Sequence, residues 1–430
     1  IAIAQDGVTT NVPALRVQQS TSVDASVQQL FALSIDHLSV HNGELLWGDR
    51  KIPLDFAVHG TNLQMDYEFL RNRYQGALSI GRADTSVSEL RPFSWMTTVN
   101  FALGPSFADI KSLQWNSGRS SLKASGRISD FRNPQIDGSY EAQLNLPDAA
   151  SILRRRDLRE GVAEFRGNGH WSLHDFTTSG TAELRDVGWQ NDQFALKRVG
   201  ASADYVITDQ QIKLTKLQGR LLAGTFAGDA EVDNWLHSVA LPKNAKGKNE
   251  DIAVISAGKP PAKKGEKPKV AGVQSGVVRI RVRDIAVSEA AKAIDVPAHP
   301  LGRFHPAGAA AGNLEAVWKG APQNAEVSFT LDAIPPARTA PRELPITAHV
   351  QGKYHGASDS LELGRFTLTT AASRIEASGT LATASNLRVS MSTSDLEEWR
   401  PLVAALDGPT DLPFRVDGDA TFNGVAGGTF

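Results

Sequence analysis

Regular alternation of apolar and polar residues recurs along the whole chain, and it restricts the fold more than any other feature. In Tyr-Glu-Ala-Gln-Leu-Asn-Leu at residues 140–146, every second residue is apolar and the residues between are polar or charged. Residues 278–283, 325–332 and 387–392 repeat the pattern. Strands buried on both faces read as continuous apolar runs, so the alternation predicts antiparallel sheets with one solvated face.

A short glycine-containing phrase repeats inside this pattern. Leu-Lys-Ala-Ser-Gly-Arg-Ile at 122–128 aligns without gaps with Ile-Glu-Ala-Ser-Gly-Thr-Leu at 375–381, and looser copies lie at 178–182 and 226–230. Each glycine falls on the predicted apolar face, where it could permit a bend or let a packed neighbour come close. A chain of 430 residues also exceeds the roughly 250 to 300 residues of one core, so it is expected either to split into domains or to repeat.

Three short helices are predicted, each after an alternating strand. Asp148 and Ser288 are candidate N-caps, and Ser394 with Glu397 forms a capping box in a helix that Pro401 should break or kink. Their spacing suggests a larger repeat of roughly 105 to 110 residues once one insertion is discounted.

The sequence thus predicts an all-β organisation interrupted by these helices and by one Lys/Pro-rich insertion, which has almost nothing to bury and is expected to be disordered. A basic contact with anionic lipid headgroups or a partner protein is an alternative role for it. The predicted order is a β segment at 1–146, a short helix at 147–160, a β segment at 161–242, the insertion at 243–272, a β segment at 273–393 with a short helix near 288–296, a short broken helix at 394–406, and the start of a further β segment at 407–430.

Charge and composition exclude several classes of protein. A formal net charge of -2 provides no field for polyanions, and the eight Trp are spread out without a basic groove, so nucleic-acid binding is not expected. The absence of Cys rules out disulfides and thiolate metal sites. No apolar run spans a bilayer, and the chain starts without Met and stops inside a predicted strand, so we expect a fragment whose anchor lies elsewhere.

No motif in the sequence points to catalysis, a metal or a cofactor. The glycines at 258 and 265 lack the Lys-Ser or Lys-Thr of a phosphate-binding loop. His37 with His41, and His170 with His174, are spaced too widely on a strand to share one metal ion. The prediction is therefore a protein that is not an enzyme, although a triad assembled from distant residues is not detectable in this way.

The alternation, the Ala-Ser-Gly phrases and the helices after strands together resemble the AsmA-like superfamily that includes TamB. The segments 31–47, 121–130 and 373–382 carry this resemblance. It implies a long β-sheet, curled and open along one side, whose apolar groove carries phospholipid acyl chains between two membranes, or which supports outer-membrane protein assembly. It also implies a periplasmic location, an inner-membrane anchor outside this segment, and an outer-membrane β-barrel partner reached through regions not present here.

The predicted fold is thus an elongated, repetitive antiparallel β-sheet curled into an open apolar groove, with a few short helices. The alternative is a structural or adhesive cell-surface β-solenoid, or a chain of β-sandwiches, with no transport role. The residues predicted to line the groove are Tyr140, Ala142, Leu144, Leu146, Val278, Ile280, Val282, Val327, Phe329, Leu331, Val389 and Met391.

Overall fold

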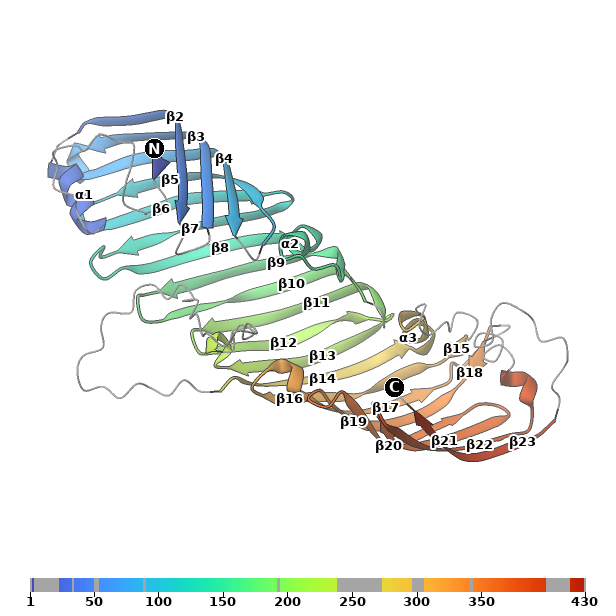
Figure 1. Ribbon diagram of the computed structural model, residues 1–430. Helices are drawn as coiled ribbons and strands as arrows, with labels where there is room; N and C mark the ends of the chain where they lie inside the picture. Colours follow the sequence, from blue (N-terminus) through green and yellow to red (C-terminus); the bar gives the residue numbers. More distant parts are fainter. Residues whose placement is uncertain are drawn as a thin grey trace, which may run out of the picture. The chain divides into compact units, whose positions relative to one another are not determined.

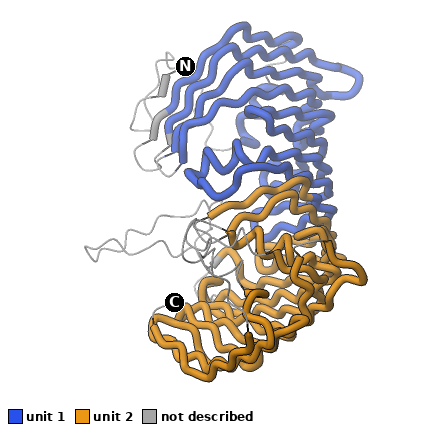
Figure 2. Tube along the Cα trace, turned by 90° about the vertical axis from the view of Figure 1, so that its right-hand side faces the viewer, with its two compact units in different colours: residues 1–183, 251–264 blue, residues 184–250, 265–430 orange. Residues whose placement is uncertain are grey.

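Antiparallel β-strands make up most of the structure, and a few short helices complete it (Figure 1). This computed structural model describes residues 2–3, 23–32, 35–49, 54–87, 90–191, 194–237, 273–295, 305–340, 343–399 and 418–428. The antiparallel all-β class predicted from the alternation is therefore confirmed. Contacts divide the chain into unit 1, described up to Glu183, and unit 2, described from Leu184 onward (Figure 2).

Unit 1 is an antiparallel ladder in which each strand pairs with the next one along the chain, from β2 to β9. Its elements are β1 (Ala2–Ile3), α1 (Val23–Ala32), β2 (His37–Asp49), β3 (Leu54–Glu68), η1 (Phe69–Arg71), β4 (Arg73–Val87), β5 (Phe93–Leu103), β6 (Phe107–Ser117), β7 (Ser120–Ser129), β8 (Gln135–Asn145), α2 (Leu146–Ile152) and β9 (Leu158–Trp171), followed by β10 (Phe176–Gln190), which begins in this unit.

Unit 2 is a second antiparallel ladder, and its first and last strands are not paired with each other in the described residues. Its elements are β11 (Ala195–Thr208), β12 (Gln211–Leu221), β13 (Gly224–Asp233), η2 (Trp235–His237), β14 (Ser275–Ala286), α3 (Val287–Ala293), β15 (Pro306–Ala307), β16 (Ala309–Lys319), η3 (Pro322–Asn324), β17 (Glu326–Ile334), β18 (Leu344–Pro345), β19 (Thr347–His355), β20 (Ser360–Thr369), β21 (Ser373–Leu381), β22 (Ser385–Thr393), η4 (Leu396–Trp399) and β23 (Ala420–Gly428).

The helix α2 is shorter than the helix predicted at 147–160, and Asp148 does not cap it. Asn145 is the N-cap, because its side-chain oxygen accepts a hydrogen bond from the Asp148 backbone N–H at 3.2 Å. Pro147 lacks a backbone N–H and is tolerated in the first turn, so the helix starts before Asp148. Leu146 consequently lies in this first turn instead of on the strand predicted for it.

The helix α1 was not predicted, because the ten residues of its sequence were assigned to the first β segment. It contacts β3 and β4 through the Phe31 ring, whose centroid lies 6.1 Å from that of Tyr67 and 5.1 Å from that of Tyr74. Among the described residues, Tyr74 is the one large side chain that is completely buried, and burial raises its pKa. A helix therefore covers the end of the β3–β4 hairpin.

The other predicted segments are described only in part. The helix predicted near 288–296 is α3, which has no side-chain cap at Ala286. Of the broken helix at 394–406, the 3₁₀ turn η4 is described, and β23 is the described strand of the segment 407–430. The predicted insertion at 243–272 lies outside the described residues.

Replacing Asn145 with alanine should lower the unfolding free energy by about 1 kcal/mol, because the α2 N-cap hydrogen bond is lost. Urea unfolding compared with the unmodified protein measures this difference. Gln143, an exposed residue two positions earlier in β8, provides the control. Its replacement by alanine should change stability by less than about 0.5 kcal/mol. An equally small effect of Asn145→Ala would show that the cap contributes nothing.

Candidate functional site

Apolar side chains form continuous rows across unit 2, because the strand register places them directly opposite one another. One row crosses ten described strands from β12 to β23 and consists of Leu217, Gly228, Ile280, Leu314, Phe329, Gly352, Leu363, Gly379, Leu387 and Ala426. The row beside it consists of Ala201, Gly219, Phe226, Val282, Gly312, Leu331, Val350, Phe366, Ala377, Val389 and Gly424.

Two further rows flank these on the same face. One runs through Tyr205, Leu214, Ala230, Val278, Ala316, Val327, Tyr354, Leu361 and Leu381. The other runs through Ile285, Ala310, Ala333, Ala348, Leu368, Ile375, Met391 and Phe422. Since every second residue of a strand points to the same side, the four rows together form one surface, the apolar face of unit 2.

Unit 1 has an apolar face built in the same way. One row crosses the eight strands β2 to β9 and consists of Val40, Leu63, Leu78, Val99, Leu113, Ala124, Tyr140 and Gly167. The row beside it includes two threonines and consists of Gly43, Thr61, Ile80, Thr97, Trp115, Leu122, Ala142 and Phe165. Leu144 pairs with Ala163 one position further along.

The structure thus brings eleven of the twelve predicted lining residues onto the apolar faces. Tyr140, Ala142 and Leu144 lie in unit 1, and all eight predicted residues of β14, β17 and β22 lie in unit 2. The exception is Leu146, which belongs to α2. The strands that join these segments, such as β16 and β19, were not predicted individually, because their glycines and alanines weaken the alternation.

These faces are only partly covered. Most row residues are intermediate in exposure, and some remain strongly accessible, such as Tyr354 at 36% and Phe422 at 56%. A sheet face packed under a second layer would be largely buried. Apart from α1, which precedes β2 and covers one end of the β3–β4 hairpin, the described helices and 3₁₀ turns follow strand ends. For example, Trp399 of η4 donates its indole N–H to Ser373 at the start of β21.

The opposite face of the strands is polar and carries cross-strand ion pairs. In unit 2, Arg279 contacts Glu315 at 2.9 Å and Asp229 at 3.5 Å, on the strands to either side of it. His349 pairs with Asp332 at 2.7 Å. Exposed pairs of this kind contribute about 0 to 1 kcal/mol each, so they add little to the stability of the sheet.

The repeated glycine phrase corresponds to one recurring structural feature. A side chain added to Gly126, Gly180, Gly228 or Gly379 would place its Cβ against a backbone carbonyl oxygen of the neighbouring strand. Because real Cβ atoms do not approach so closely, only glycine allows the strands to lie as they do at these points. Of the two roles expected for these glycines, the close approach of a packed neighbour is therefore observed at all four positions.

Other glycines of the apolar faces are covered by aromatic rings from directly opposite residues. Gly352 is paired with Phe329, and Gly276 is paired with Trp318. A Cβ at either glycine would meet the opposing ring within 3 Å. The aromatic side chain occupies the space that the glycine leaves empty, which keeps the row apolar across the gap.

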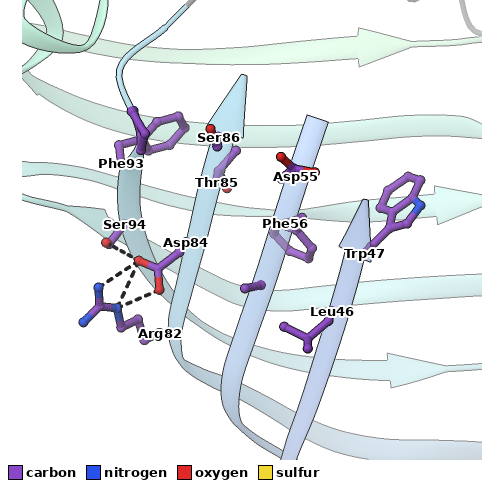
Figure 3. A pocket seen from close by; sticks show the side chains of 12 residues that line it. Leu46, Trp47, Asp55, Phe56, Arg82, Asp84, Thr85, Ser86, Phe93 and Ser94 are labelled. Carbon is purple, nitrogen blue, oxygen red and sulfur yellow. Dashed lines mark hydrogen bonds and ion pairs between the residues drawn. The ribbon is translucent and has the colours of Figure 1, made fainter. Parts of the chain in front are cut away.

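A shallow cavity lies where β2, β3 and β4 bend. Their bends coincide with register shifts beside Asn42, Gly60 and Gly81, and the distal ends of these strands run steeply across the sheet behind them (Figure 1). The cavity has a volume of about 580 Å³, and Figure 3 shows Trp47 and Phe56 in its lining. No predicted lining residue belongs to it.

One carboxylate in the lining of this cavity, that of Asp84, is already neutralised. Arg82 donates to both carboxylate oxygens of Asp84 at 3.0 Å, and Ser94 donates to Asp84 from the next strand (Figure 3). These hydrogen bonds, led by the one from Arg82, hold the pKa of Asp84 below its ordinary value. The pair thus resembles the ion pairs of the polar face more than a reactive group.

The described residues offer no arrangement for metal binding. No group of three or more His, Asp or Glu side chains among them could hold a metal ion. His37 and His170, each from one of the two His pairs discussed above, bond to Asp66 and Asp137 on neighbouring strands at 2.6 and 2.7 Å. Within the described ranges, no helix is long and apolar enough to cross a membrane.

Comparison with known proteins adds no assignment: no family model matches the chain, and no curated protein and no solved structure is significantly similar to it.

Proposed function

We propose that the apolar faces bind the acyl chains of phospholipids and that the protein supports lipid transport between the inner and outer membranes of a bacterial envelope. Such a role places it in the periplasm, and it agrees with the resemblance to the AsmA-like superfamily. The apolar face of each unit would then line an open groove of its own. Support for outer-membrane protein assembly is part of the same proposal, since both follow from the resemblance.

The observation that carries this proposal is the continuity of the apolar rows. In unit 2, one row passes from β12 to β23 without a polar residue at any of its ten described positions. An acyl chain needs a path of this kind, because a polar group left unpaired in hydrocarbon costs several kcal/mol. A passive scaffold needs only enough apolar contact at each strand pair to hold the sheet together.

Partial exposure favours the same function over the structural alternative. In a β-sandwich, the apolar face would be covered by a second sheet about 10 Å away. No second sheet of comparable size is present among the described residues, where the other sheet is the two-stranded pair of β15 and β18. An apolar surface left open in this way marks a ligand or partner site.

Purification of the full chain without detergent, followed by lipid extraction and mass spectrometry, tests the proposal. We expect phospholipids to co-purify in at least equimolar amount, and the lipid-free protein to take up a fluorescent phospholipid. The apolar surface provides the driving force, at roughly 25 cal/mol per Å² removed from water. A chain that purifies without lipid and takes up none in the uptake assay would favour the structural or adhesive alternative.

A further inference from the structure

Six exposed arginines gather at one rim of unit 1, where α2 meets the loop that precedes β5. These residues, the arginine rim, are Arg91, Arg119, Arg154, Arg155, Arg156 and Arg159. Arg91 approaches α2 from a segment about sixty positions earlier, and its backbone N–H donates to the Ile152 carbonyl at 2.9 Å. In turn, the Arg154 guanidinium donates a hydrogen bond to the Leu90 carbonyl of that earlier segment at 3.2 Å. The fold therefore brings these charges together.

Two of the six arginines are neutralised within the rim. Arg119 contacts Asp148 at 2.6 Å, and Arg155 pairs with Asp157. In each case the hydrogen bond from the arginine holds the pKa of the carboxyl group below its ordinary value. Both carboxylates are thus ionised at neutral pH and occupied by these two arginines.

The other four arginines lack such neutralisation. The Arg91 guanidinium donates to the Ser151 hydroxyl at 3.4 Å and that of Arg154 to a backbone carbonyl, so both acceptors are uncharged. Within the described part of the chain, neither Arg156 nor Arg159 is in a salt bridge. Glu160 is the remaining carboxylate of the segment 148–160. The rim consequently carries a local positive charge on a protein whose net charge is slightly negative.

An exposed apolar residue lies among these charges. Leu153, the C-cap of α2, is 56% exposed and directly precedes the three consecutive arginines. Arginines around an exposed leucine fit the interfacial region of a bilayer, where the guanidinium groups meet phosphates and the apolar side chain enters the acyl boundary. A soluble phosphate would use the charges but not the leucine.

We infer that the arginine rim docks unit 1 on an anionic phospholipid bilayer, with Leu153 entering the membrane interface. This inference goes beyond the proposed function, because an acyl groove requires no positive charge and no contact with an intact bilayer. Guanidinium groups bind phosphate oxygens in two-point geometry, so Arg91, Arg154 and Arg156 are expected to carry most of the contact.

Vesicle co-sedimentation of the full chain tests the docking. Vesicles containing phosphatidylglycerol should bind the protein, and vesicles of phosphatidylcholine alone should bind it much more weakly. Joint replacement of Arg91, Arg154 and Arg156 by glutamine should weaken binding to the anionic vesicles roughly a hundred-fold, given the usual contribution of each basic residue near such a surface. Raising the salt concentration should also weaken binding of the protein to the anionic vesicles.

The matched control variant also loses three arginines, but on a different surface of the protein. Arg281, Arg365 and Arg388 are exposed and lie on three different strands of the polar face of unit 2, so their joint replacement by glutamine should leave vesicle binding unchanged. Equal losses in both triple variants, or full binding by the rim variant, would overturn the docking proposal. The docking proposal would also be overturned if the rim bound inorganic phosphate but the protein did not bind vesicles.

The amount of co-purified lipid distinguishes the docking proposal from the proposed binding of acyl chains. The rim variant should retain co-purified lipid, because its changes lie outside the apolar rows. Loss of vesicle binding with normal lipid content supports docking independently of transport. Leu153→Ser should weaken vesicle binding several-fold without a change in net charge, whereas unchanged binding of this variant would contradict insertion at the interface.

Discussion

Replacing Phe329 with aspartate should remove most of the lipid that co-purifies with the protein, while the chain stays folded. Phe329 lies in the central row of unit 2, between Leu314 and Gly352 on the two neighbouring strands. A carboxylate at this position would lie in the proposed acyl path, where an unpaired charge costs several kcal/mol or draws water onto the apolar face. We expect at least about a tenfold loss of bound phospholipid, which corresponds to about 1.4 kcal/mol.

Thr330 provides the matched control, because the next residue of a strand points to the other side of the sheet. Thr330 is paired with Asn313 and Gln351 on the two neighbouring strands, and all three residues belong to the polar face. Thr330→Asp therefore adds the same charge outside the apolar face. Its effect on stability should be within about 0.5 kcal/mol, and its lipid content should be unchanged. Quantitative lipid mass spectrometry with circular dichroism of both variants makes the comparison.

A second replacement separates lipid binding from packing. The Phe329 ring covers Gly352, so its loss also opens a gap in the sheet surface. Phe329→Leu leaves part of that gap but introduces no charge, and it should retain lipid. Normal lipid content in a well-folded Phe329→Asp protein would exclude a continuous acyl path at β17. Unfolding of Phe329→Asp at neutral pH, with Phe329→Leu fully stable, would instead identify this row as an ordinary core.

Replacing Gly228 with alanine should destabilise unit 2 by about 3 kcal/mol or more, although only one methyl group is added. The new Cβ would lie closer to the Arg279 backbone carbonyl oxygen than any real Cβ contact allows. Since that oxygen belongs to the neighbouring strand β14, relief requires the two strands to move apart. Such overpacking typically costs about 1 to 3 kcal/mol, and a clash with backbone belongs at the upper end.

Gly364 is the control for this substitution, because it lies in a strand of the same unit with room for a methyl group. The nearest atom to an added Cβ there is the Gln351 carbonyl oxygen at 3.6 Å, an ordinary contact. Gly364→Ala should therefore be neutral or stabilising by about 0.4 to 1 kcal/mol, since alanine restricts the unfolded chain. Thermal and urea unfolding compare the two variants, and equal stabilities would show that the sheet relaxes around Gly228.

The sequence alone determined the class of fold and the two-sided character of the strands. Alternation is a local property with a period of two, so residues such as Val327, Phe329 and Leu331 were assigned to one face of a strand without knowledge of its neighbours. The role of the repeated Ala-Ser-Gly phrase could also be predicted, because a glycine on an apolar face usually permits a bend or a close approach of a neighbour.

Tertiary structure alone decided which segments lie beside one another. Register is set by pairing between strands, so the row that joins Ile280 to Phe329 through Leu314 is not visible in any single segment. The exact start of α2 depended on Pro147 and on the Asn145 side chain. The helix α1 was recognisable only through its contacts with Tyr67 and Tyr74. The arginine rim arises in the same way, since hydrogen bonds between distant segments bring Arg91 to Arg154. Local periodicity fixes the faces of each strand, but pairing energies summed over many strands fix their order and register.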